Sequence, residues 1–333
     1  MAVTIRDVAR EANVATSTVS RVLSNNPKIS DETKNRVQEA IDKLNYKPNA
    51  IARGLANNKT RILGVVLPNE AQDLFGNPFF LQAMKGMSLY AQSKDYYITY
   101  AFSKDDESEK KYIMDFTNSK LVDGVCLLRA KDNDEMIAYL KEINFPFVVI
   151  GRPEDTDGVL WVDNDNFQAM YSLVNKLVHK GHKDIGLIYA KEHWNVSKDR
   201  LKGYEVACEM NGININKNIM VGGEAFSEKS GYEAMQTILK GNKVSAIIAT
   251  DDLLAFGAMK VMEEKGINDI AIVGFNNIPL DELRTPRLAS VDINPTNLGY
   301  YATKLLIDKL ENNESEKKHY IVETHLIERE SMR

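Results

Sequence analysis

Cysteine is scarce in this chain, which has only two, Cys126 and Cys208, among 333 residues. They lie far apart and form no Cys-x-x-Cys pair, which excludes a disulfide scaffold, a cysteine-built zinc site and a redox pair. The chain also lacks an uninterrupted apolar run of about 18 residues, and its N-terminus carries Arg6, Asp7 and Arg10 in place of a signal-peptide core. We therefore expect a soluble protein of the cytoplasm with no membrane partner.

The common motifs of nucleotide-binding and hydrolytic enzymes are missing as well. There is no Gly-x-Gly-x-x-Gly, no P-loop, no Gly-x-Ser-x-Gly and no His-Glu-x-x-His. Gly222 and Gly223 lack a third glycine and are interpreted as a loop. His179 and His182 flank Gly181 at an expected helix end, where cations favour the helix dipole, and they do not indicate a metal site. We expect no enzyme, no metal and no cofactor.

The net charge of −5 conceals an asymmetry along the chain. Residues 1–59 carry ten basic and six acidic side chains, a net charge of +4, which leaves −9 on the remainder. With 27% charged and 44% hydrophobic residues the composition is that of a folded protein, and at about 150 residues per domain the length predicts two or more domains. A basic head on an acidic body indicates that only the head contacts a polyanion, although chance could also produce this imbalance.

The basic head has the spacing of three short helices. Thr4 and Asp7 fit a capping box before a helix over about 5–12, and Asn13 stands where the chain must turn. A second helix over about 16–24 follows, and Ser30 caps a third. The outer face of the second helix carries Thr16, Ser17, Ser20 and Arg21. This is a helix-turn-helix pattern, whose second helix can enter the major groove of DNA; a generic three-helix bundle is the alternative.

Three segments of the chain carry a family resemblance. The segments Thr4–Ala9 and Val14–Leu23, and then Tyr46–Leu55 about 25 residues further on, resemble the DNA-binding head of the LacI–GalR transcription regulators. One departure is Asn13, where glycine is commoner in that family, but asparagine also fits a left-handed turn. The resemblance implies a helix-turn-helix domain over 1–47, a hinge over 48–60 and a near-palindromic operator DNA as partner.

The resemblance also implies which residues meet DNA. Base edges would be read by Thr16, Ser17 and Arg21, since arginine can bond guanine bidentately. Residues 49–57 are too few to hold a helix alone, and on DNA Leu55 would enter the minor groove as a wedge; a plain linker is the alternative. Contacts to the DNA backbone would come from Thr4, Ser20, Asn49 and Ala52.

From Ile62 onward short apolar runs alternate with longer amphipathic stretches. Strands are expected over 62–67, 97–101, 124–128, 147–150, 185–189, 244–249 and 270–273, and helices over about 78–93, 105–118 and 132–143. This alternation predicts an α/β fold with parallel sheets, in two lobes over about 62–160 and 161–290. The layout resembles the periplasmic-binding-protein-like body of the same family, here 61–333, in which C-terminal segments cross between the lobes.

Two facing lobes would enclose a cleft at the carboxyl ends of their strands. The family's effector-binding pattern maps there onto Arg200, Phe226, Asp252 and Asn276, with further first-lobe contacts at Asp73, Phe75 and Asn77. Carboxylates, a guanidinium and an aromatic face suit the hydroxyls and ring of a sugar. Structural roles are the alternative for some of them: helix capping for Asp251 and Asp252, an interlobe salt bridge for Arg200 and core packing for Phe226.

A narrower resemblance concerns the effector. The stretches Val66–Asn69, Asp73–Phe80 and Gly86–Met87 resemble maltose-operon repressors of Gram-positive bacteria, which implies a repressor of a sugar-utilisation operon controlled by maltose or a related maltooligosaccharide. One alternative is a global carbon-catabolite regulator of the same family controlled by a phosphocarrier protein. The other is a sugar-processing enzyme with a DNA-binding head. No heptad repeat follows Leu310, so a homodimer formed through the body is expected.

Overall fold

The computed structural model describes residues 3–23, 26–47, 59–68, 77–190, 192–312 and 317–332. The chain divides into two compact units, Met1–Thr60 and Arg61–Arg333. Among the described residues, no helix combines the length and the apolar character that a membrane span requires.

The first unit consists of three helices, α1 (Ile5–Glu11), α2 (Thr16–Leu23) and α3 (Asp31–Lys43). Its small core contains Val8, Val19 and Val37, all fully buried. The expected turn between α1 and α2 is confirmed, because Asn13 has a φ of 52°, in the left-handed region that asparagine tolerates. The expected caps are present too. Asp7 accepts a bond from the Thr4 N–H at 2.9 Å, and Ser30 caps α3.

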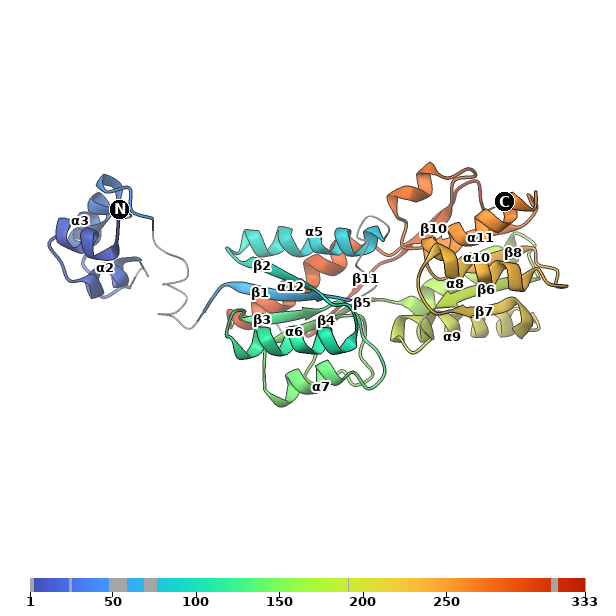
Figure 1. Ribbon diagram of the computed structural model, residues 1–333, viewed down its shortest axis with the longest axis horizontal. Helices are drawn as coiled ribbons and strands as arrows, with labels where there is room; N and C mark the ends of the chain where they lie inside the picture. Colours follow the sequence, from blue (N-terminus) through green and yellow to red (C-terminus); the bar gives the residue numbers. More distant parts are fainter. Residues whose placement is uncertain are drawn as a thin grey trace. The chain divides into compact units, whose positions relative to one another are not determined.

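The second unit begins with a lobe built on a six-stranded parallel sheet (Figure 1). Its strands lie in the order β11 (His319–Val322), β5 (Leu160–Asn164), β4 (Phe147–Ile150), β3 (Gly124–Leu127), β1 (Ile62–Leu67) and β2 (Tyr97–Phe102). One face is covered by α5 (Pro78–Ser93) and α12 (Pro295–Leu310), and the other by α6 (Asp106–Asn118) and α7 (Glu135–Glu142). The helices α5 and α12 approach closely at Gly86, where a Cβ would lie 1.8 Å from the Thr296 carbonyl oxygen.

The second lobe repeats this plan. Its sheet order is β12 (His325–Ile327), β10 (Ala289–Asp292), β9 (Ala271–Phe275), β8 (Ala246–Ala249), β6 (Ile185–Ala190) and β7 (Met220–Gly223). Every pairing is parallel except that of β10 with β12. The helices pack in two pairs, α8 (Asn166–His179) with α9 (Asn195–Met210) and α10 (Glu228–Ile238) with α11 (Asp252–Glu264). Short 3-10 turns lie at Lys217–Ile219 and Pro279–Leu283.

The chain crosses between the two lobes three times. It crosses from β5 to α8, from β10 to α12 and from β11 to β12. The expected boundary at about residue 160 is corrected here, because β5, over 160–164, pairs with β4 in the first sheet. Asn164, at the first crossover, donates from Nδ2 to the Ile293 and Val322 carbonyl oxygens, each at 2.9 Å. One buried side chain therefore joins all three crossovers.

Candidate functional site

The exposed face of α2 carries the side chains that the sequence assigns to DNA. These four side chains, Thr16, Ser17, Ser20 and Arg21, are exposed. Val19 on the same helix is fully buried in the core of this unit. Thr4 is exposed as well, although its hydroxyl donates to Asp7 Oδ2 at 2.7 Å. The predicted outer face of the second helix is confirmed.

Five other predicted site residues lie outside the part of the chain that the structure describes. They are Asn49, Ala52 and Leu55 in the hinge, and Asp73 and Phe75 after β1. The expected hinge helix over 49–57 lies outside it too. Their roles stay predictions.

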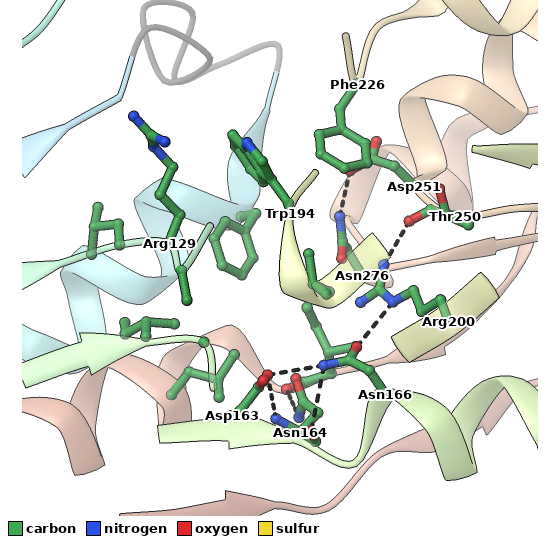
Figure 2. A pocket seen from close by; sticks show the side chains of 18 of the residues that line it. Arg129, Asp163, Asn164, Asn166, Trp194, Arg200, Phe226, Thr250, Asp251 and Asn276 are labelled. Atoms are coloured by element: carbon green, nitrogen blue, oxygen red, sulfur yellow. Dashed lines mark hydrogen bonds between the residues drawn. The ribbon is translucent and has the colours of Figure 1, made fainter. Parts of the chain in front are cut away.

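A cavity lies between the two lobes of the second unit, at the carboxyl ends of their strands (Figure 2). It holds about 100 Å³. Its wall combines aromatic rings with convergent polar groups, the composition typical of small-molecule sites. The rings are Phe79, Phe80, Trp194 and Phe226, and the polar groups are Asn77, Arg129, Asp163, Asn164, Asn166, Arg200, Thr250, Asp251 and Asn276.

Arg200 is the central cation of this cavity. It comes from α9 and is only 4% exposed. Its Nε donates to Asn166 Oδ1 at 2.9 Å, its Nη1 donates to the Thr250 carbonyl oxygen at 2.6 Å, and its guanidinium lies 4.3 Å from the Phe275 ring centroid. Burial lowers the pKa of Arg200 to about 10, so it stays charged at neutral pH. Nη2 bonds to no described residue, and the expected alternative of an interlobe salt bridge is not observed for this side chain.

Asp251 and Asn276 form the acceptor side of the cavity. Asp251 caps α11 by accepting from the Leu253 N–H at 2.8 Å, and its other oxygen accepts from Asn276 Nδ2 at 2.7 Å. Burial raises the pKa of Asp251 to about 6, although the positive charge of Arg200 acts in the opposite direction. Asn276 has a φ of 108°, which directs the chain sharply after β9. The Asp251 carboxylate therefore both caps α11 and lines the cavity.

The prediction for Asp252 requires correction, because this residue is absent from the cavity wall. Its carboxylate is fully buried behind α11, where Oδ1 accepts from Ser290 Oγ at 2.7 Å and Oδ2 from the Ile278 N–H at 3.1 Å. The physical reason is the turn of the helix. Consecutive residues at a helix start point in different directions, so only Asp251 faces the cleft.

The crossover from β5 to α8 forms the floor of the cavity (Figure 2). Asp163 accepts from the backbone N–H groups of Arg152 and Asn164, at 2.8 and 2.7 Å, and from Asn166 Nδ2 at 2.9 Å. Burial raises the pKa of Asp163 to about 6. Asn166 in turn accepts from Arg200, so the floor and the central cation form one hydrogen-bonded network.

Aromatic rings close the cavity on its opposite side. Trp194 precedes α9, and its ring centroid lies 5.6 Å from that of Phe226. The Arg129 guanidinium lies 5.4 Å from the Trp194 ring centroid and also pairs with Asp106 and Glu109. Phe226 is half-buried and contributes both to the cavity wall and to packing against the core of the second lobe.

The structure brings four predicted residues together, namely Asn77, Arg200, Phe226 and Asn276. Several lining residues were not among the predicted contacts: Arg129, Asp163, Asn166 and Thr250. Position at a strand's carboxyl end could have indicated Arg129 and Thr250, which follow β3 and β8. No group of three or more metal-ligating side chains occurs among the described residues.

Comparison with known proteins agrees with both units. Residues 4–49 match the model for bacterial regulatory proteins of the lacI family, and residues 174–332 match that of a periplasmic binding protein-like domain. The chain is 34% identical over 322 residues to the HTH-type transcriptional regulator MalR of Streptococcus pneumoniae, covering 96% of each chain. It is also 34% identical over 331 residues to catabolite control protein A of Staphylococcus aureus, covering 98% of each.

The fold is also similar to the solved structure of a probable maltose operon transcriptional repressor malR from Staphylococcus aureus. The two chains are 26% identical with a TM-score of 0.75, and the match covers 83% of this chain and 99% of that chain. Together with the geometry of α2 and of the two-lobed body, these similarities show that the chain belongs to the LacI family of bacterial regulatory proteins, which are DNA-binding transcription regulators and not enzymes.

Proposed function

We propose that the protein represses a sugar-utilisation operon in the cytoplasm and that maltose or a related maltooligosaccharide controls it by binding in the cleft. The observation that carries this proposal is the convergence of Arg200, Asp251 and Asn276 on a cavity walled by Trp194 and Phe226. The maltose-operon regulator among the similar structures supports the choice of sugar.

The proposed contacts follow from sugar chemistry. The Asp251 carboxylate accepts from a sugar hydroxyl, and Arg200 Nη2 donates to another. Trp194 and Phe226 cover the apolar C–H face of a pyranose ring. Asn77 and Asn276 supply further amide groups, and Asp73 and Phe75 are proposed as first-lobe contacts from the sequence alone. Asp252 is fully buried and is not proposed to contact the sugar.

The size of the cavity connects sugar binding to the arrangement of the lobes. Its volume of about 100 Å³ is below the range of about 300–1,000 Å³ typical of small-molecule sites. A disaccharide therefore enters only when the lobes move apart. A ligand that binds one lobe arrangement better than another shifts the equilibrium between them, and through it the affinity for DNA.

DNA binding is assigned to the first unit. Thr16, Ser17 and Arg21 on α2 are proposed to read base edges of a near-palindromic operator, and Thr4 and Ser20 to contact phosphates. Asn49, Ala52 and Leu55 complete the proposed hinge contacts, with Leu55 as a minor-groove wedge.

We assign the homodimer contact to the surface of α5 and β2, which expose large apolar side chains. Leu81 and Leu89 are 45% and 52% exposed and lie eight residues apart, on one face of α5. Tyr97 and Phe102, at the two ends of the edge strand β2, are 70% and 43% exposed. A second copy seated here would remove these side chains from water.

Titration calorimetry of the full-length protein tests the effector. Maltose is expected to release or absorb heat with the wild-type protein, and its affinity should fall about 10- to 100-fold in Arg200→Gln, because a hydrogen bond to a charged group contributes about 1.5–3 kcal/mol. Arg287→Gln, which removes a surface arginine paired with Glu330, is the matched control and should bind maltose normally. Operator affinity measured without sugar should remain unchanged in both variants.

The chain is as similar to catabolite control protein A as to MalR, at 34% identity. This similarity favours a second candidate function, that of a regulator controlled by a phosphocarrier protein. The same calorimeter separates the two. Binding of a phosphorylated carrier protein without any binding of maltose would replace the proposed function with this one.

A further inference from the structure

The second unit begins at Arg61, where the hinge expected over 48–60 joins the body. Arg61 has a φ of 56°, a left-handed conformation that is uncommon for a residue other than glycine. Such a conformation persists only where surrounding contacts hold it. Here the Arg61 N–H donates to Asp123 Oδ2, and the Arg61 carbonyl oxygen accepts from the Tyr97 N–H, both at 2.8 Å. The body therefore begins with a fixed turn.

The side chain of Arg61 joins the ends of two helices. Its Nη1 donates to the carbonyl oxygen of Lys94, the C-cap of α5, at 2.9 Å. Its Nη2 lies 3.4 Å from Oε1 of Glu311, the C-cap of α12. The guanidinium also lies 5.2 Å from the ring centroid of Tyr96, which is only 2% exposed. We call the contacts of Arg61 with Lys94, Tyr96 and Glu311 the junction clamp.

The same two helices begin at the cleft. Asn77, the N-cap of α5, lines the cleft cavity, and so does Phe80 in the first turn of that helix. The helix α12 starts directly after the β10–α12 crossover, and Leu298 in its first turn lines the same cavity. Each helix has 16 residues and is therefore about 24 Å long. Both helices thus reach from the cleft wall to the junction clamp.

The helices α5 and α12 pack closely against each other. A Cβ at Gly299 would lie 2.0 Å from the Ala83 carbonyl oxygen, so the two backbones meet there as they do at Gly86. Nearer the clamp, the hydroxyl of Tyr90 on α5 donates to Asp308 Oδ1 on α12 at 3.2 Å. Because close-packed interiors have low compressibility and transmit strain, a displacement at the cleft end of this pair reaches the clamp end.

We infer that Arg61 is a positioning residue, which couples the cleft to DNA binding by fixing the start of the body to the ends of α5 and α12. The arrangement that the cleft imposes on the two helices passes through the junction clamp to the peptide bond between Thr60 and Arg61, and so to the hinge. Without the side chain, the backbone bonds of Arg61 remain, but the helix ends are no longer joined to that point. The inference rests on the proposed function for the identity of the sugar.

Operator binding with and without maltose tests the inference in the full-length protein, on a DNA duplex selected for binding to the wild type. In Arg61→Ala, the factor by which saturating maltose changes the operator Kd should fall about fivefold. Maltose affinity measured by calorimetry without DNA should be unchanged, and the variant should remain dimeric. Glu311→Ala should also reduce the factor, and the double variant should lose no more than Arg61→Ala alone, because both residues act in one clamp.

Hydrogen exchange tests the junction clamp without any sugar. Operator binding should change the exchange of backbone amides in the N-terminal halves of α5 and α12 in the wild type, but not in Arg61→Ala. Loss of a purely structural contact would alter exchange near Lys94 equally with and without DNA. Arg61→Lys keeps a cation but not the planar fork that joins both helix ends, so it should restore only part of the response.

Arg284→Ala is the matched control for both measurements. Arg284 also pairs with a carboxylate, that of Glu228, and its guanidinium also lies near an aromatic ring, 4.0 Å from the Phe256 centroid, but in the second lobe. This variant should keep the wild-type response to maltose and the wild-type exchange pattern.

Four results would overturn the inference. They are an unchanged maltose factor in Arg61→Ala, an exchange response to operator that persists in this variant, no such response in the wild type, and a monomeric Arg61→Ala protein. Should Arg61→Ala not fold, Glu311→Ala decides by the same measurements. If the wild-type protein does not bind maltose, the proposed function fails, and the exchange measurement still decides whether the clamp couples the cleft to DNA.

Discussion

Asp252 and Asp281 are two carboxylates of the second lobe with no exposed surface. Burial raises the pKa of each well above the ordinary value of an aspartate, and their mutual repulsion raises that of Asp252 further. Arg329 lies 4.0 Å from Asp281 and only partly offsets this effect. Two adjacent buried carboxylates hold a proton more readily than separate exposed ones, so we expect the pair to retain one near neutral pH.

This shared proton has a consequence for stability. Because both pKa values are raised, the native state binds protons that the unfolded chain has released, and stability falls as the pH rises above the ordinary carboxylate range. We expect the melting temperature of the second unit to decline between about pH 5 and about pH 8. The amide of Asp281→Asn cannot ionise, so its decline should be shallower.

Melting curves recorded across that pH range check this expectation. Asp269→Asn, at an exposed aspartate of the same lobe, is the control and should keep the wild-type slope. An Asp281→Asn protein with an unaltered slope would show that the pair does not hold the proton.

At the scale of elements, the start of α9 joins the second lobe to loops of the first. Trp194 pairs with Lys131 in an isolated antiparallel bridge, and Asn195 Nδ2 donates to the Arg152 carbonyl oxygen at 2.8 Å. Lys198 on the same helix forms ion pairs with Asp132 and Glu154 of the first lobe. These contacts hold the lobes together around the cleft.

Lys198→Ala should therefore destabilise the arrangement in which the two lobes contact each other around the cleft. Water and salt screen exposed ion pairs, which therefore contribute little, so sugar affinity should fall by no more than about fivefold, mainly through faster dissociation. Stopped-flow fluorescence of Trp194, in the cavity wall, measures the rate. Lys202→Ala removes a lysine of α9 that pairs with Glu205 on the same helix, and it should dissociate at the wild-type rate. Equal rates in the two variants would argue against the interlobe ion pairs.

At the scale of the whole molecule, the proposed dimer makes operator binding bivalent. Leu89→Glu places a charge in the middle of the apolar face of α5 and should yield monomers in analytical ultracentrifugation. Operator affinity should then drop by about 100-fold or more, because the second half-site is no longer bound intramolecularly, while sugar binding persists.

Leu121→Glu provides the comparison for this experiment. Leu121 is 47% exposed and follows α6, which covers the opposite face of the sheet from α5, and this variant should remain dimeric. If the Leu89→Glu protein remained dimeric, the dimer contact would have to lie on another surface.

Local sequence patterns were sufficient for most individual elements. The helical spacing and caps of the first unit predicted α1, α2 and α3, and the apolar runs placed seven strands of the body within a few residues of their observed ends. They did not predict β5, β7, β10, β11 and β12. β7 ends in Gly222 and Gly223, which suggested a loop, and β12 spans only three residues. Such strands form because a neighbouring strand supplies hydrogen bonds, which no local pattern records.

The sequence by itself determined the helices of the first unit, seven strands of the body, the basic head and the edge of the sheets at which the cavity lies, because periodicity and capping act over a few residues. Only the tertiary structure decided that Asp251 rather than Asp252 faces the cleft, and that Asn164 joins carbonyl groups 129 and 158 residues away. These contacts depend on the pairing of strands that are remote along the chain. Their geometry is fixed only when both sheets and all three crossovers are assembled.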